Sequence, residues 1–197
     1  MNKKIIITLP LPPGVNNYKK YKVMFQGGRP IATPYLTKQA TDFKQYAIFK
    51  LKEAAKNKNW ETPDKDKYIA MRLKFYMNKL GKDADNHIKL IQDAIQDAGL
   101  VENDSKLIPI VERLYVDSND PRVKIYLHEL DWIGIFDNKN DRDFFINENC
   151  ISCKRYKRNC SILKSLDENK IVSEVDFVQG ICKKNSNLIE QNKNKTI

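Results

Sequence analysis

The chain has 197 residues, of which 41% are hydrophobic and 30% charged, and its formal net charge is +10. This balance is typical of a folded globular protein and excludes a disordered one, which would carry fewer apolar residues. No apolar run approaches the roughly 20 residues needed to cross a bilayer, so we expect no membrane partner. The apolar stretch near the N-terminus reaches proline too early for a signal peptide, and we therefore expect a cytoplasmic protein.

Charge and cysteine are unevenly distributed along the chain. Residues 1–130 hold 23 Lys and Arg against 15 Asp and Glu, a surplus of +8, whereas residues 131–197 hold 12 against 10, a surplus of +2. A basic surplus favours polyanions such as nucleic acid, although it can also serve solubility alone. All four cysteines lie in the second region. We therefore predict a main domain over 1–130, followed over 131–197 by a linker, a cysteine-rich module and a polar tail.

Residues 1–58 begin with strand patterns and end with a helical one. The β-branched run at 4–9 predicts a strand that the following prolines end. A hairpin is expected around Gly27-Gly28. Thr37 can cap a helix over 37–58, in which apolar residues repeat at helical spacing.

The pattern continues to residue 130 with a strand, a helix and two more strands. Alternation predicts a strand over 68–77 with Ile69, Met71, Leu73 and Phe75 on one face. A helix is expected over 86–98, ended by Gly99. Strands are expected over 107–116 and 122–130, joined by a hairpin turn at 117–121. The order predicts an α+β fold with a small mixed sheet and helices packed on one face.

Acidic residues gather around the helix expected over 86–98. Asp83 and Asp85 precede it, Lys89 follows Asp85 by one helical turn, and Asp104 comes after a turn at Gly99. Three converging carboxylates would repel one another unless a cation joined them, and Mg²⁺ prefers such oxygen ligands. A metal of this kind can activate water against a phosphodiester, with Lys89 as a stabilising point charge.

A purely structural interpretation of the same residues stays open. Acidic residues often cap helices, and Asp–Lys pairs four apart are common on solvated faces. Asp93 and Asp97 are interpreted as surface or supporting residues. His87 lies inside the pattern, but we expect a packed or exposed histidine rather than a base.

Several spaced motifs are similar to those of one known family. Asp83-x-Asp85-Asn86-x-x-Lys89 is followed by Asp93-Ala94, Ala98-Gly99 and Asn103-Asp104, and the opening strand by a Pro-Pro and an Asn-Asn segment at 12–13 and 16–17. With these motifs in this order, residues 1 to about 130 resemble the RusA family of Holliday junction resolvases, endonucleases common in phages and prophages. The family's acidic turn is often Asp-Asp, whereas this chain has Asn103 at its first position.

The resemblance implies a function and a set of site residues. Asp83, Asp85 and Asp104 would be the metal-binding catalytic carboxylates, and Lys89 the essential lysine. The family further implies Mg²⁺ as cofactor, a homodimer acting on branched DNA, and a bacterial or phage-infected cell as the setting. A homodimer matches the two-fold symmetry of a four-way junction, which needs two paired nicks.

Basic residues near these motifs are candidates for DNA binding. We predict that Lys79 and Lys82 face phosphates near the metal, and that Lys19 and Lys20 contact the DNA backbone. Tyr18 and Tyr21, interleaved with the latter pair, could stack on an unpaired base or serve packing alone.

The cysteines follow a C-x2-C-x6-C-x21-C pattern at Cys150, Cys153, Cys160 and Cys182. A C-x2-C pair with two further thiolates can close a structural Zn²⁺ site. An iron–sulfur cluster and unligated thiols are the alternatives, while disulfides do not suit a cytosolic protein. This module lies outside the resemblance, and the sequence assigns it no role.

The sequence as a whole predicts a Mg²⁺-dependent endodeoxyribonuclease that resolves Holliday junctions. The alternatives are a non-catalytic DNA-binding or regulatory protein on the same scaffold, and a nuclease for other branched DNA such as flaps or forks.

Overall fold

The computed structural model describes residues 4–79 and 81–185, so most of the polar tail expected at the C-terminus lies outside the described residues. The chain divides into two compact units, residues 1–130 and 131–197. No helix in the described ranges is long and apolar enough to cross a membrane.

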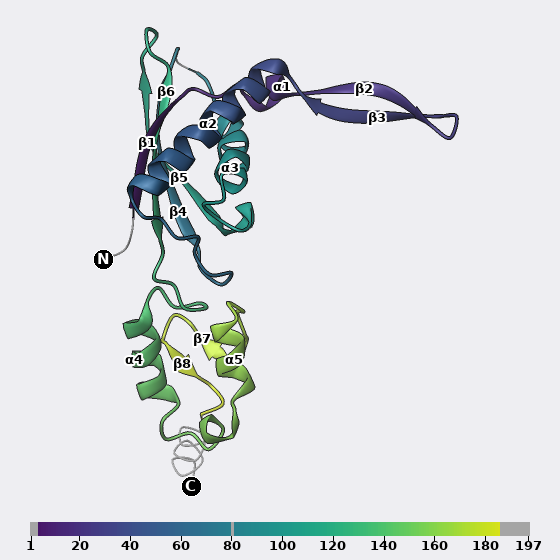
Figure 1. Ribbon diagram of the computed structural model, residues 1–197. Helices are drawn as coiled ribbons and strands as arrows, with labels where there is room; N and C mark the ends of the chain where they lie inside the picture. The colour runs from purple at the N-terminus through teal and green to yellow at the C-terminus, as the bar shows by residue number, and fades with distance from the viewer. Residues whose placement is uncertain (1–3, 80, 186–197) are drawn as a thin grey trace. The chain divides into compact units, whose positions relative to one another are not determined.

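Unit 1 is an α+β domain built on one mixed four-stranded sheet, as the sequence predicts (Figure 1). Its strand order is β1-β6-β4-β5, with β4 parallel to β5 and the other two pairings antiparallel. Its elements are β1 (Lys4–Pro10), α1 (Val15–Tyr18), β2 (Lys19–Gln26), β3 (Arg29–Leu36), α2 (Lys38–Asn57), β4 (Ile69–Met77), η1 (Asp85–His87), α3 (Ile88–Asp97), η2 (Asp104–Lys106), β5 (Leu107–Val116) and β6 (Arg122–Glu129).

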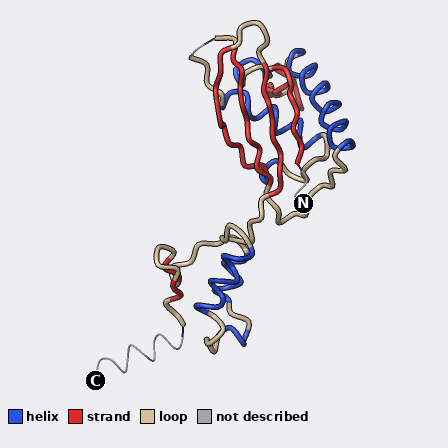
Figure 2. Tube along the Cα trace, turned by 90° about the vertical axis from the view of Figure 1, so that its left-hand side faces the viewer, coloured by secondary structure: helices blue, strands red, loops and turns tan. Residues whose placement is uncertain are grey.

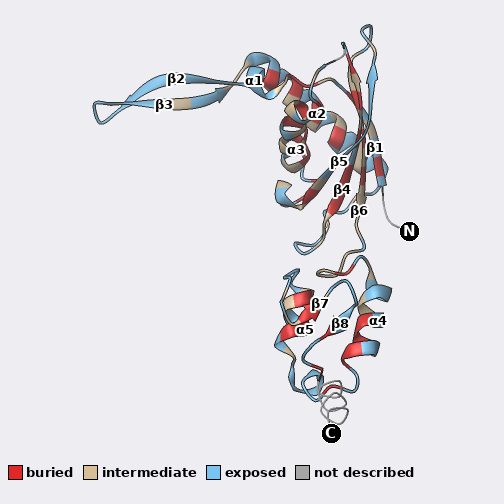
Figure 3. Ribbon diagram, turned by 180° about the vertical axis from the view of Figure 1, so that it is seen from behind, coloured by how far each residue is buried: buried red, intermediate tan, exposed pale blue. Residues whose placement is uncertain are grey.

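Helices α2 and α3 pack against the same side of this sheet (Figure 2). The four alternating apolar residues predicted to share a face of β4 are all buried, with at most 1% of each exposed. Figure 3 shows the buried residues of the sheet and of both helices meeting in this layer. One core of 24 described residues therefore holds the sheet and the two helices together.

The N-cap of α2 is confirmed. The Thr37 hydroxyl oxygen accepts a hydrogen bond from the Ala40 amide at 3.3 Å and donates one to the Asn17 carbonyl at 3.0 Å. Because the Thr37 amide also donates to the Tyr18 carbonyl at 2.9 Å, the cap fastens the start of α2 to α1.

The hairpin at Gly27-Gly28 is confirmed and extends over two eight-residue strands, β2 and β3. Both glycines have positive φ, +57° and +77°, which a type I′ turn requires and which glycine adopts without steric cost. All eight residues of β2 are exposed. The two strands form a sheet of their own, separate from the four-stranded one.

The predicted hairpin turn at 117–121 is wrong. The strands before and after it do not pair, because β5 and β6 lie on opposite sides of β4. The connection crosses the end of β4, where the Asp117 amide donates to the Met77 carbonyl at 2.7 Å. Turn-forming residues mark a reversal of the chain, but they do not decide whether another strand has entered between the two arms.

Unit 2 is small and has short elements. They are α4 (Lys139–Asn149), η3 (Tyr156–Arg158), α5 (Ser161–Asp167), β7 (Val175–Asp176) and β8 (Ile181–Cys182). Its core holds nine described residues, two of them cysteines. A bidentate ion pair joins Arg142 of α4 to Asp167 of α5, with N–O distances of 2.6 and 2.8 Å.

Candidate functional site

The acidic motif lies where the chain enters α3 of unit 1. A short 3-10 turn, η1, leads directly into the helix, so the helical region begins at Asp85. His87 ends this turn and is only 6% exposed. Its Nδ1 lies 2.6 Å from the Pro12 carbonyl oxygen and must carry the proton, since a carbonyl can only accept.

His87 therefore has a packing role, as expected from the sequence. Burial is the largest cause of the lowered pKa of His87, which the hydrogen bond to Pro12 opposes. The neutral ring ties the Pro-Pro segment to the start of α3. This contact brings the two motifs of the N-terminal half together, although 75 residues separate them.

The first two carboxylates lie at the surface near this contact. Asp83 and Asp85 are both exposed. The Asp85 carboxylate accepts a hydrogen bond from the Asn86 amide at 2.9 Å. Asp83 lines a hollow of about 260 Å³ together with Asn16, Asn17 and Lys82. The fold thus places the Asn-Asn segment, for which the sequence predicted no chemical role, beside the first carboxylate.

The third carboxylate reaches the same helix through Lys89. The Lys89 ammonium forms an ion pair with Asp104, and a second one with Asp93 at 3.0 Å. The hydrogen bonds that Lys89 donates to Asp104 first, and then to Asp93, raise the pKa of Lys89 to about 12. Lys89 is thus a permanent positive charge at working pH and not a proton donor.

Three neighbours fix the position of Asp104. Gly99, at φ +78°, ends the helical segment and turns the chain back. The Asp104 amide donates to the side-chain oxygen of Gln96 on α3 at 3.1 Å. Asn103 caps η2, because its side-chain oxygen accepts from the Ser105 amide at 2.9 Å. An aspartate could cap in the same way, so the departure at Asn103 keeps this local structure.

The carboxylates are not gathered around a single point. Within residues 4–79 and 81–185, no three or more His, Cys, Asp or Glu side chains are arranged to hold a metal ion. Asp104 instead meets the ammonium of Lys89. Asp104 thus contacts Lys89 near the start of α3, whereas Asp83 lines the hollow with Asn16 and Asn17.

The four lysines predicted to bind DNA lie in two places. Lys82 is half-buried beside Asp83, and Lys79 is exposed two residues after β4. Lys19 and Lys20 are exposed at the start of β2. Tyr18 is 3% exposed and belongs to the core, so of its two interpretations the structure supports packing. Tyr21 is 70% exposed.

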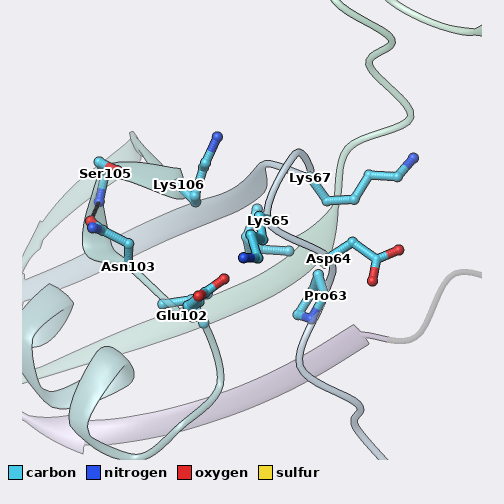
Figure 4. Close-up of a pocket in the computed structure, with 10 residues that line it drawn as sticks. Pro63, Asp64, Lys65, Lys67, Glu102, Asn103, Ser105 and Lys106 are labelled. Carbon is cyan, nitrogen blue, oxygen red and sulfur yellow. Dashed lines mark hydrogen bonds between the residues drawn. The ribbon is translucent and has the colours of Figure 1, made fainter.

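A second hollow, of about 360 Å³, adjoins the turn that carries Asp104 (Figure 4). Lys65, Lys67 and Lys106 line it together with Asp64 and Glu102. The opposing charges largely offset one another, and the carboxylate of Asp104 is not part of the lining. We assign no site to it.

The cysteines of unit 2 come from three segments. Cys150 and Cys153 follow α4, Cys160 precedes α5, and Cys182 ends β8. None of the four forms a disulfide, and all but Cys160 are buried. Burial, followed by the charges of the other three thiols, raises the pKa of Cys150 to about 11. The four thiols are thus close enough to interact electrostatically.

Comparison with known proteins adds little to these observations. No family model matches the chain, and neither does any curated protein. Among solved structures, the chain is similar to 2C-methyl-D-erythritol 2,4-cyclodiphosphate synthase from Plasmodium vivax, with 9% identity over 65% of this chain and 94% of that one. The TM-score is 0.29, and a likeness this weak carries no argument about fold or function.

Proposed function

We propose that the protein is a Mg²⁺-dependent endodeoxyribonuclease that resolves four-way DNA junctions. One observation carries the proposal: Lys89 and Asp104, which are 15 residues apart, meet beside the segment that holds Asp83 and Asp85. Two residues of the motif that resembles the RusA family are thus paired near the start of α3, which supports the proposal. The net charge of +8 over residues 1–130 supports a polyanionic substrate.

The donors present suit Mg²⁺ chemically. Asp83, Asp85 and Asp104 offer carboxylate oxygens, and the first two are exposed to solvent and to substrate. When bound, the ion would lower the pKa of a water molecule and offset negative charge at the phosphate. Asp104 would have to exchange its contact with Lys89 for the ion, which leaves the ammonium free for another anion.

Lys89 has a defined part in this scheme. A lysine is positively charged at neutral pH even without the Asp104 contact, so it acts on a phosphate oxygen through charge and hydrogen bonding. Asp93 contacts Lys89 from one turn further along α3 and holds the ammonium near the site after Asp104 turns to the metal. Asp93 is accordingly a positioning residue.

The proposal is tested by cleavage of a synthetic four-way junction with Mg²⁺ and with EDTA. We expect Asp85→Asn to reduce the cleavage rate by about 100-fold or more and to retain junction binding. Asp97→Asn is the matched control, because this residue lies on the same helix but pairs with Lys44 at 2.7 Å. Equal rates for Asp85→Asn and the unchanged protein would refute the assignment.

The same assay separates the alternatives. A non-catalytic DNA-binding protein would bind the junction without metal-dependent cleavage. A nuclease for other branched DNA would cut flaps or forks faster than junctions of the same arm sequence.

A homodimer is part of the proposal, since paired nicks on a two-fold symmetric junction call for two copies of the site. The hairpin exposes Tyr21, Val23 and Phe25, with 66–75% of each side chain accessible. Apolar side chains grouped in this way are typical of protein interfaces. Sedimentation velocity should give a dimer that Phe25→Ser weakens, and a monomer at all concentrations would contradict this part.

A further inference from the structure

The chain after α4 and the chain after β8 make the same kind of turn. The Cys153 amide donates to the Cys150 carbonyl at 2.8 Å, and the Asn185 amide donates to the Cys182 carbonyl at 3.0 Å. Each turn thus reverses the backbone directly after a cysteine. The first turn presents two thiols, Cys150 and Cys153, and the second presents Cys182.

Backbone amides also lie near the sulfur of Cys182. The amides of Lys184 and Asn185 are within hydrogen-bonding reach of this side chain. Amide hydrogen bonds to a sulfur disperse the negative charge of a thiolate, as the partners of metal ligands commonly do.

Asn149 joins the two turns. It immediately precedes Cys150 and is 4% exposed. Its side-chain oxygen accepts from the Cys182 amide at 2.8 Å, and its side-chain nitrogen donates to the carbonyls of Phe145 and Gly180 at 3.1 and 2.9 Å. The bond to Phe145 lies within α4, while the bonds to Gly180 and Cys182 hold the end of α4 against the chain at β8 and so bring Cys150 and Cys182 together.

The chemistry of four thiols in one small core favours a metal. Four thiolates repel one another unless a cation joins them, and such a set selects zinc or an iron–sulfur cluster. Zinc with four thiolates carries a charge of −2. The segment between the second and third cysteines supplies compensating charge from Lys154, Arg155, Lys157 and Arg158. No three or more His, Cys, Asp or Glu side chains in the described part of the chain are arranged to hold a metal ion, so the four thiols would have to turn toward the ion as it binds.

The unit also needs a stabilising element beyond its core. A core cluster of nine described residues is small for an independent unit of this length, and small domains of this kind commonly rely on a metal or on disulfides. None of the four cysteines forms a disulfide.

We infer that Cys150, Cys153, Cys160 and Cys182 bind one structural Zn²⁺ as four thiolates, with Asn149 as the residue that positions the first and last ligands. The thiols rotate onto the ion and release four protons as the four zinc–sulfur bonds form. The site holds unit 2 together and takes no part in phosphodiester cleavage.

Metal content of the full chain, purified without chelator, tests this inference. Elemental analysis should give about one zinc per chain, and Cys182→Ser should lose most of it. Ser152→Ala, an exposed change inside the first turn, should leave it unchanged. Iron with inorganic sulfide, or a metal-free protein whose four thiols all titrate, would overturn the assignment. Asp85→Asn should keep its zinc, so this test stands apart from the cleavage assay.

Two further measurements keep the inference testable if a cysteine variant fails to fold. Co²⁺ exchanged into the unchanged protein should give the intense visible and thiolate charge-transfer bands of a tetrahedral tetrathiolate, and a spectrum without them would count against it. Asn149→Ala should still bind one zinc. Its zinc affinity, measured by competition with a chelator, should be about 10–100-fold lower than that of the unchanged protein. An unchanged zinc affinity would remove Asn149 from the site.

Discussion

The two units of this chain contrast in what holds them together. The core cluster of unit 1 holds 24 described residues of its sheet, its helices and their connections, whereas that of unit 2 holds nine, two of which are cysteines. Apolar burial alone can stabilise the first, and its polar residues are then free for chemistry at the surface. In the second, the cysteines are part of the core. A residue's chemistry therefore has a different meaning in each unit, and the four predictions below test that contrast.

Core truncation should produce the largest effects, and they should differ in kind. Phe75→Ala in β4, where the side chain is fully buried, should cost about 3–5 kcal/mol in the free energy of unfolding of unit 1. The loss should be the same with and without chelator. Leu166→Ala in α5 should instead lower the affinity of unit 2 for the zinc ion that we infer there, because folding and metal binding would then be coupled. Urea unfolding measures the stability of unit 1, and chelator competition measures the zinc affinity of unit 2. If the effect of Phe75→Ala depended on chelator, the two units would not differ in the way described.

Removal of the Lys89 charge should slow cleavage strongly and leave the stability of unit 1 unchanged. Lys89→Met should slow junction cleavage by about 100–1,000-fold, since the site loses its permanent positive charge. Lys44→Met is the control, because Lys44 pairs with Asp97 and not with Asp104. Zinc content should be unchanged in both variants. Equal cleavage rates for the two would show that Lys89 is only a surface ion-pair partner.

Glycine replacement distinguishes a packed turn from an open one. Gly134 has φ +55°, and a Cβ there would lie 2.0 Å from the Leu166 carbonyl oxygen, so Gly134→Ala must displace backbone in unit 2. We expect a loss of about 2–3 kcal/mol from strain and displacement together. Gly28→Ala meets open space at φ +77° and should cost about 1 kcal/mol. Limited proteolysis should show unit 2 opening only in the first variant, and equal susceptibility would argue against the close packing at Gly134.

Helix caps should give the smallest effects. Thr37→Ala and Asn138→Ala each remove an N-cap, of α2 and α4 respectively, and each should cost about 1 kcal/mol. In unit 2 this loss should appear as about fivefold weaker zinc binding, since 1.4 kcal/mol corresponds to a factor of ten. Thr37→Ala should leave zinc affinity unchanged. A shift of equal size in both variants would mean that the two units unfold together.

Local patterns predicted most elements of unit 1. The alternation in β4, the Thr37 cap and the two glycines of the hairpin each act within a few residues, and the structure confirms all three. The strand order could not be predicted in this way. The entry of β4 between β5 and β6 is a non-local choice, made by which apolar faces the helices cover, and turn residues carry no information about it.

The same distinction applies to the candidate site. Sequence spacing placed Lys89 one turn after Asp85, but its contact with Asp104 depends on how the chain reverses after Gly99 and on the hydrogen bond from the Asp104 amide to Gln96. Asn149 could not be recognised either, because its three partners include the Cys182 amide and the Gly180 carbonyl, more than 30 residues away. The helices of unit 2 were also missed, since its charged and polar composition weakens their apolar periodicity.

The β2–β3 hairpin should open more easily than the rest of unit 1. An isolated pair of strands is only marginally stable in water, and every residue of β2 is exposed. Its amide hydrogens should therefore exchange with solvent far sooner than those of β4, at an opening free energy near zero. A hairpin that opens and closes so readily can adjust its shape to a partner while the rest of unit 1 stays folded.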